Sequence, residues 1–220
     1  MDEYLSEKEQ IDLIKRWWRE NGWFLIGGVA VFAIGWFGWQ QYQAYRQRVA
    51  EEAAALYLEL GAAVEDDDRD RADELLARLA SEFESSAYLD QGRLLLASEN
   101  LIRDTQRSID ELTAVMEGSR DEGTSMIARL RLARVLAYDE QFERALEVLN
   151  VSDTGEFEAR FSEVRGDVHA AMGNVEAAIS AYTDALLRGG NGTVDLEFLQ
   201  LKLNELIQVG RPDSGEEDAG

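Results

Sequence analysis

Residues Trp23 to Trp39 read WFLIGGVAVFAIGWFGW, and this stretch decides how the chain is organised. It lies within an uncharged interval of 25 residues, between Glu20 and Arg46. About 20 apolar residues suffice for a helix to cross the ~30 Å hydrocarbon core of a bilayer. The stretch is too long for the apolar core of a signal peptide, and no small-residue cleavage site follows Trp39. It therefore predicts one uncleaved transmembrane helix within residues 21–45.

The aromatic residues around this segment favour the same interpretation. All five tryptophans of the chain lie between positions 17 and 39, in two groups. From Trp18 to Trp39 a helix rises about 32 Å, at about 1.5 Å per residue, and tryptophan and tyrosine favour both membrane interfaces. A buried core helix is the alternative, but a globular core would spread its tryptophans along the chain. The candidate membrane-interface residues are Trp17, Trp18, Trp23, Trp36, Trp39 and Tyr42.

Two glycines in the span lie seven residues apart, and so on one face of the helix. Small residues let helix backbones approach each other closely in lipid, so Gly28 and Gly35 are a candidate helix contact. The alternative is that lipid simply tolerates glycine there.

Residues 1–20 are predicted to form a cytoplasmic amphipathic tail. Ser6 and Glu9 have the spacing of a capping box, which predicts a helix from about Glu7 with a bend at Asn21 and Gly22. Four bases precede the span closely and only two follow it closely, so the excess of positive charge places residues 46–220 outside the cytoplasm. The six bases are Lys8, Lys15, Arg16, Arg19, Arg46 and Arg48.

The remainder of the chain is strongly acidic. The net charge is −22, and residues 1–45 hold four bases and six acids, which leaves −20 on residues 46–220. This charge repels phosphate backbones and anionic lipid, so nucleic-acid binding is excluded and the partners are expected to be basic or uncharged. Adaptation to a saline habitat would also explain it. The absence of cysteine excludes disulfides and thiolate metal sites.

A repeat of helix pairs is visible after residue 46. The segment from Met126, MIARLRLARVLAYDEQFERALEVLN, matches the segment 33 residues later from Ala159, ARFSEVRGDVHAAMGNVEAAISAYTDAL. Ala133 corresponds to Gly166, and a small residue there lets two helices of a pair touch. Such pairs bury their apolar faces only by stacking on neighbours.

These features resemble the tetratricopeptide repeat. Residues 50–80 and 85–117 are expected to form two degenerate earlier repeats, and breaks are expected at 65–70, 118–123, 139–141, 152–155, 173–174 and 189–192. The predicted fold class is all-α, with a single N-terminal transmembrane helix, a tetratricopeptide-like solenoid over residues 46–208 and a disordered tail over 209–220. A generic helical bundle is the alternative.

The tract Glu7–Gln40 closely resembles the N-terminus of the YfgM-like ancillary subunits of the bacterial SecYEG translocon. The residues that carry the resemblance are Ile14-Lys15, Trp17-Trp18, Asn21-Gly22 and Gly38-Trp39-Gln40. The resemblance implies a single-pass inner-membrane protein with a periplasmic repeat domain. It also implies association with SecYEG and the membrane-anchored periplasmic chaperone PpiD, and contact with emerging polypeptides. A scaffold for envelope or division machinery is the alternative function.

Residues for catalysis or for metal binding are scarce. His169 is the only histidine, which excludes histidine triads and multi-histidine metal sites. The acidic run 65–70 departs from a calcium loop at Arg71 and Ala77, which stand where glycine and glutamate are needed. We therefore expect no enzyme, no cofactor and no metal.

The first helix of each tetratricopeptide pair lines a concave groove. Transferring the groove positions to the two clearest repeats gives Arg134, Tyr138, Arg160, Glu163 and Asp167. Their mixed charge suits an extended peptide or a partner segment, and an ordinary solvated face is the alternative.

Overall fold

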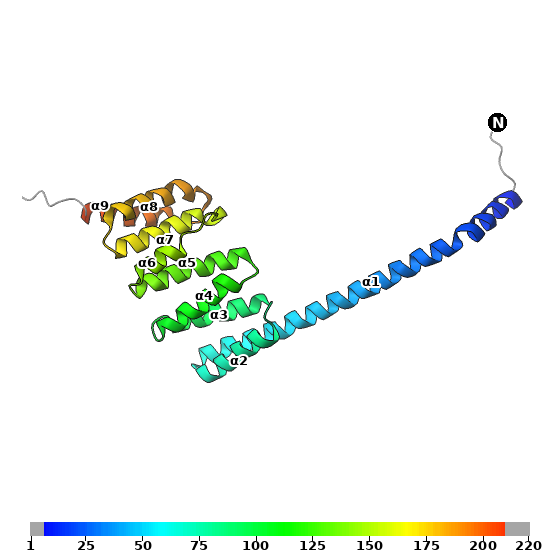
Figure 1. Cartoon of the computed structure of the whole chain (residues 1–220), viewed down its shortest axis with the longest axis horizontal. Coiled ribbons are helices and arrows are strands. Elements are labelled where there is room, and N and C mark those ends of the chain that lie inside the picture. The colour runs from blue at the N-terminus through cyan, green and yellow to red at the C-terminus, as the bar shows by residue number, and fades with distance from the viewer. Residues whose placement is uncertain (1–6, 210–220) are drawn as a thin grey trace, which may run out of the picture. The chain divides into compact units, whose positions relative to one another are not determined.

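The computed structural model describes residues 7–209, and every regular element within that range is helical. The prediction of an all-α fold is confirmed. The elements are α1 (Glu7–Glu65), α2 (Arg69–Glu82), α3 (Ala87–Asn100), α4 (Thr105–Gly118), α5 (Glu122–Tyr138), α6 (Phe142–Val148), the short η1 (Gly155–Phe157), α7 (Glu158–Ala171), α8 (Val175–Arg188), η2 (Gly189–Asn191) and α9 (Leu196–Val209), as Figure 1 shows.

The chain divides into two compact units, residues 1–52 and 53–220. The first unit is the greater part of α1, whose apolar side chains are exposed. Only 6% of the most apolar window of α1 is buried in the structure, whereas the core helix of a soluble domain is mostly buried. By length and composition α1 is the one helix in the described part of the chain that is suited to crossing a membrane.

The helix α1 begins at Glu7, as predicted, and Ser6 lies outside the described residues. It continues without interruption through Asn21 and Gly22, where we expected a bend. The Asn21 side-chain amide donates a hydrogen bond to the Trp17 carbonyl at 3.2 Å. A Cβ at residue 22 would lie 3.3 Å from the Trp18 indole, so the glycine lets this ring lie against the helix backbone.

The second unit stacks helix pairs in chain order, as Figure 1 shows. The end of α1 pairs with α2, α3 with α4, α5 with α6, and α7 with α8, and α9 packs on α8. Helices from neighbouring pairs also contact each other, such as α4 with α5 and α5 with α7. No pair closes a core alone, which is the organisation expected of a helical-repeat solenoid.

Three apolar clusters form the core of this solenoid. The first joins the end of α1 to α2 and α3 through Leu60, Leu75 and Leu79. The second, centred on α5, extends from α3 to α7 and includes the fully buried Phe161. The third packs α7, α8 and α9 around Tyr182 and Leu199.

The structure has two turns that the sequence analysis did not predict, at residues 83–86 and 101–104. Both precede helices with polar caps. The Ser86 hydroxyl accepts a hydrogen bond from the Tyr88 amide at 3.3 Å, and the Asp104 carboxylate accepts one from the Arg107 amide at 3.1 Å. Side-chain acceptors of this kind satisfy amides at the helix start that have no partner within the helix.

We expect Asp104→Ala to lower the free energy of unfolding by about 1 kcal/mol, because it removes the cap of α4. Chemical unfolding of the full chain in detergent, followed by circular dichroism, measures the change. Asp104→Asn is the control, because asparagine caps helices as well as aspartate does. Equal stability of the alanine variant and the unaltered chain would contradict the assignment.

Candidate functional site

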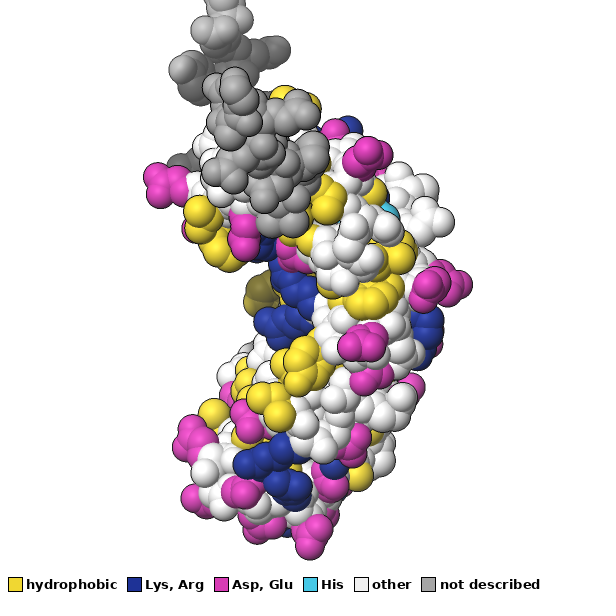
Figure 2. Space-filling view, turned by 90° about the vertical axis from the view of Figure 1, so that its left-hand side faces the viewer, with side chains coloured by type: hydrophobic (Ala, Val, Ile, Leu, Met, Phe, Trp, Pro, Cys, Tyr) yellow, Lys and Arg dark blue, Asp and Glu magenta, His cyan; other side chains and the backbone are white. Residues whose placement is uncertain are grey.

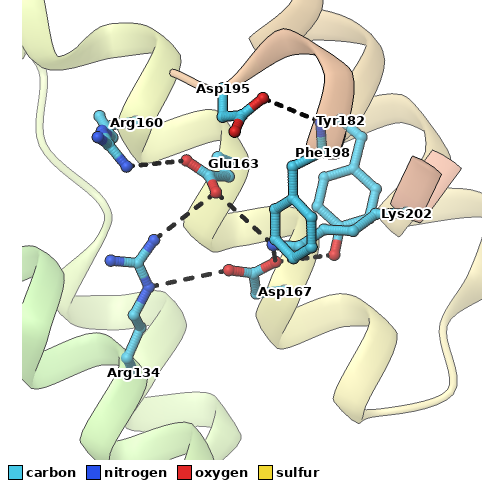
Figure 3. A network of polar contacts seen from close by, with 8 residues as sticks. All are labelled: Arg134, Arg160, Glu163, Asp167, Tyr182, Asp195, Phe198 and Lys202. Carbon is cyan, nitrogen blue, oxygen red and sulfur yellow. Dashed lines mark hydrogen bonds and ion pairs between the residues drawn. The ribbon is translucent and has the colours of Figure 1, made fainter. Parts of the chain in front are cut away.

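Four of the five predicted groove residues meet in one polar network, drawn in Figure 3. Arg134 comes from α5, and Arg160, Glu163 and Asp167 come from successive turns of α7. Residues 160, 163 and 167 share one face of α7, because positions three and four apart are neighbours on a helix. Tyr138 lies one turn beyond Arg134 on α5, has 63% of its surface exposed and does not belong to the network.

Glu163 is the most buried charged group of this network. Its side chain is 10% exposed, and three cations surround it. The nearest nitrogens of Arg160, Lys202 and Arg134 lie 3.5, 3.6 and 3.9 Å from its carboxylate oxygens. A buried carboxylate is costly without such partners, so these cations compensate for the desolvation of Glu163.

Asp167 joins α7 to α8 and α9. Its Oδ1 accepts a hydrogen bond from the Lys202 ammonium at 2.7 Å and one from the Tyr182 hydroxyl at 2.8 Å. Burial, and then the neighbouring charge of Asp167, raise the pKa of the Tyr182 phenol far above its ordinary value. The hydroxyl therefore stays protonated and donates to Asp167 throughout the physiological pH range.

Sequence reasoning missed the contributions of Lys202 and Phe198. Lys202 is the only lysine after Lys15. Its ammonium lies 4.8 Å from the centre of the Phe198 ring and 5.6 Å from that of the Tyr182 ring, within the range of a cation–π contact. The apolar periodicity of residues 196–207 after a glycine-rich turn is a helix signal. It did not reveal which groove residues the helix would meet.

We expect Lys202→Met to lower the free energy of unfolding by about 1 kcal/mol, because Asp167 loses a charged hydrogen bond. Thermal unfolding of the full chain in detergent measures the loss. A double-mutant cycle with Asp167→Asn isolates the pair. If Lys202→Met costs as much when Asp167 is already asparagine, the contact does not stabilise the fold.

The acidic run at residues 65–70 supplies a helix cap and an ion pair. Asp68 caps α2 by accepting a hydrogen bond from the Arg71 amide at 3.1 Å. Asp67 pairs with Arg103 at 2.7 Å, and that hydrogen bond lowers the pKa of the Asp67 carboxyl. Within residues 7–209 no three His, Asp or Glu side chains are arranged to hold a metal ion.

The predicted membrane residues all lie on α1 with open surroundings. The five tryptophans and Tyr42 are each more than half exposed. A Cβ built on Gly28 or on Gly35 meets no other atom within 4 Å, so both glycines leave room for a neighbouring helix. That a neighbouring helix contacts Gly28 and Gly35 stays a prediction.

Comparison with known proteins identifies the fold family. The family model described as a tetratricopeptide repeat-like domain matches residues 15–208. The chain belongs to this tetratricopeptide repeat-like family. The match includes most of α1 together with the whole stack of helix pairs, so the family describes both units of the chain. The expected tetratricopeptide-like fold is thereby confirmed.

The relatives of this tetratricopeptide repeat-like protein carry one shared name. The ancillary SecYEG translocon subunit of Haemophilus influenzae is 27% identical over 92% of this chain and 98% of its own length. Those of Neisseria gonorrhoeae and Escherichia coli K12 are 26% and 24% identical, each over 94% of this chain and over 100% and 99% of their own lengths. No solved structure matches the chain. The resemblance to the YfgM-like translocon subunits is confirmed.

Proposed function

We propose that this protein is a non-enzymatic adaptor of the bacterial inner membrane that associates with the SecYEG translocon. The observation that carries the proposal is the end-to-end match with proteins named ancillary SecYEG translocon subunits. Because the match spans nearly the whole length of both chains, it includes the anchor and the repeats together. A shared repeat fold alone would not support the same function.

The two units suit two tasks. The exposed apolar surface of α1 suits insertion into lipid beside a membrane channel, and Gly28 and Gly35 suit close contact with a helix of that channel. The stacked pairs suit a partner that binds across several helices. We propose that the N-terminus is cytoplasmic and that residues 46–220 are periplasmic, on the excess of bases ahead of the span.

The finer part of the proposal concerns the periplasmic partner. We propose that the repeat domain holds the chaperone PpiD near the translocon exit, where emerging envelope and secreted proteins need protection. The family resemblance of residues 7–40 supports this partner. The network around Glu163 and the exposed Tyr138 are the proposed contact region, because they combine charge with an accessible aromatic ring.

The test is extraction of the tagged full chain from its native bacterium in mild detergent. We expect SecY and PpiD to co-purify with it. When residues 1–52 are replaced by an unrelated single-span anchor of the same orientation, we expect SecY to be lost and PpiD to be retained, because the repeat domain is unchanged. Repeated absence of SecY from the native sample would overturn the translocon assignment. Enrichment of division or peptidoglycan-linked proteins instead would support an envelope scaffold.

Orientation has a separate test. Protease added to intact spheroplasts should degrade the repeat domain and leave a small membrane-protected fragment that contains α1 residues. A cytoplasmic control protein must stay intact in the same sample. A repeat domain that resists protease until the membrane is lysed would reverse the proposed topology.

A further inference from the structure

Arg134 and Arg160 lie near carboxylates, but these carboxylates do not engage all the hydrogen-bond donors of the two guanidinium groups. Arg134 makes two ion pairs at 3.8 and 3.9 Å and no hydrogen bond to any residue that the structure describes. Among the described residues Arg160 has one polar contact, with Glu163 at 3.5 Å. Charge-assisted hydrogen bonds are ordinarily ~2.7–2.9 Å long, so most donors of both guanidinium groups remain available.

Some arginines elsewhere in the repeat domain are paired more tightly. Arg71 contacts two glutamates at 2.9 and 3.0 Å, and Arg103 contacts Asp67 at 2.7 Å. Those guanidinium groups have donated strong hydrogen bonds already. Other arginines are paired as loosely, such as Arg93, which lies 3.7 Å from Glu111. Arg134 and Arg160 differ from them because both lie beside the same carboxylate, that of Glu163.

The α7 network, defined as Arg134, Arg160, Glu163, Asp167, Tyr182 and Lys202, is locally cationic. It holds three cations and two carboxylates, in a chain whose net charge is −22. Glu163, Lys202 and Asp167 are the more buried charged groups, with side chains 10%, 22% and 25% exposed, whereas the two arginine side chains are 43% and 45% exposed. The face of this network that a partner would meet is therefore guanidinium.

The two guanidinium groups approach the same carboxylate, that of Glu163. Arg134 approaches Oε1 of Glu163 and Arg160 approaches Oε2 of the same carboxylate, and Figure 3 shows both on the same side of it. Figure 2 shows that lysine and arginine side chains gather in the hollow of one face of the molecule. Two forked donors this close can share one incoming carboxylate or bind two adjacent ones.

Exposed apolar side chains lie on α5 and α9, the helices that carry Arg134 and Lys202. Tyr138 follows Arg134 by one turn of α5 and is 63% exposed. On α9, Phe198 and Leu201 lie three residues apart on one side of the helix and are 51% and 62% exposed, next to Lys202. An extended segment that bound the arginines and followed these helices would meet exposed apolar side chains as well.

We propose that Arg134 and Arg160 form a carboxylate-binding site for an extended, acidic and apolar segment of a partner protein. The inference rests on the proposed adaptor function and gives the chemistry of the segment that the repeat domain binds. Tyr138, Phe198 and Leu201 take the apolar side chains of that segment. Charge complementarity selects an acidic segment, because the exposed donors are cationic and the neighbouring acids are already compensated.

The negative charge on the rest of the chain does not prevent this binding. At physiological ionic strength charges are screened beyond ~8 Å, so a bound carboxylate responds chiefly to the arginines beside it. The distant charge still slows the approach of an acidic partner. Binding should therefore be short-ranged, and a specific contact rather than general attraction should carry the affinity.

The test uses the full chain in lipid nanodiscs and two fluorescent peptides of eight residues. One peptide contains two adjacent glutamates followed by phenylalanine and leucine, and the other has glutamine in place of both glutamates. Both have blocked ends. We expect the glutamate peptide to bind at least tenfold more tightly than the glutamine peptide, as measured by fluorescence anisotropy.

Variants locate the site. The double variant Arg134→Gln/Arg160→Gln should bind the glutamate peptide at least tenfold more weakly and lose the preference for glutamate over glutamine. Arg78→Gln is the matched control, since Arg78 has 44% of its side chain exposed and lies on α2; its binding should change by less than twofold. Unchanged peptide preference in the double variant would overturn the site.

Two further outcomes count against the proposal. If a chain that ends at Val209 binds the glutamate peptide markedly more tightly, then residues 210–220, and not a partner, occupy the site. If neither peptide binds the unaltered chain, there is no carboxylate site. Both outcomes are independent of the adaptor function, because co-purification of SecY with the unaltered chain is measured without any peptide.

Discussion

A chain that carries both Val31→Arg and Ile34→Arg is expected to be lost from the membrane fraction. Both residues lie near the middle of the apolar stretch of α1, and both are exposed in the structure, 72% and 74%. An arginine at the centre of a span costs ~2.5–3.5 kcal/mol, and each aliphatic residue it replaces contributed a few tenths of a kcal/mol. The two changes together therefore disfavour insertion by about 6 kcal/mol. Alkaline extraction of membranes followed by immunoblotting measures the remaining membrane-bound fraction.

The control carries the same two charges outside the apolar stretch. Gln43→Arg and Gln47→Arg lie on α1 beyond Trp39, where arginine side chains reach the interface at little cost. This control should stay in the alkali-washed membranes. If the Val31→Arg/Ile34→Arg chain also stayed there, α1 would not be held in lipid through this stretch, and the anchor assignment would be wrong.

The span and the two clearest repeats were predictable because each rests on a local signal. The apolar stretch and its tryptophans follow one another along the chain, and Gly166 and Ala133 occupy the same place in two copies of one pattern. That four of the predicted groove residues lie together could be predicted in the same way, since they share one face of α7 or lie opposite it on α5, whereas their binding of a partner stays a prediction. Periodicity alone gives the face of a helix.

The partners across the fold were not predictable in this way. Lys202 reaches Asp167 from 35 residues away, and nothing in the spacing of either residue indicates the contact. The turns before α3 and α4 were missed because Ser86 and Asp104 stand among many other polar residues, so neither cap is conspicuous. Contacts between distant segments depend on packing that only the structure shows. The hydrogen bonds of Lys202 and Tyr182 to Asp167 and the inferred carboxylate site both depend on such contacts.

The close packing of α7 on α8 depends on the absence of a side chain at residue 166. A Cβ built there would lie 2.4 Å from two carbons of the Tyr182 ring, more than 1 Å closer than the ordinary contact distance of ~3.5–4.0 Å. The ring has no room to retreat, because it is 3% exposed and its hydroxyl is bonded to Asp167. Gly166→Ala must therefore push the two helices apart or break that hydrogen bond.

We expect Gly166→Ala to lower the free energy of unfolding by about 2 kcal/mol, which corresponds to about 4–8 °C in a domain of this size. The overpacking has to exceed the ~1 kcal/mol by which alanine favours a helix over glycine. Thermal unfolding of the full chain in detergent measures the change. The control is Gly61→Ala, since residue 61 lies within α1 and has no atom within 4 Å of the added Cβ; this variant should be as stable as the unaltered chain or more so.

The preceding repeat supplies the compensating change. Ala133 and Leu149 occupy the positions that correspond to Gly166 and Tyr182, and both are fully buried. The combination Gly166→Ala/Tyr182→Leu should therefore recover much of the stability that Gly166→Ala loses, although it forfeits the hydrogen bond to Asp167. If Tyr182→Leu were as damaging with alanine at residue 166 as with glycine, the ring would not be the obstacle. The 33-residue correspondence would then describe a likeness of sequence without a likeness of packing.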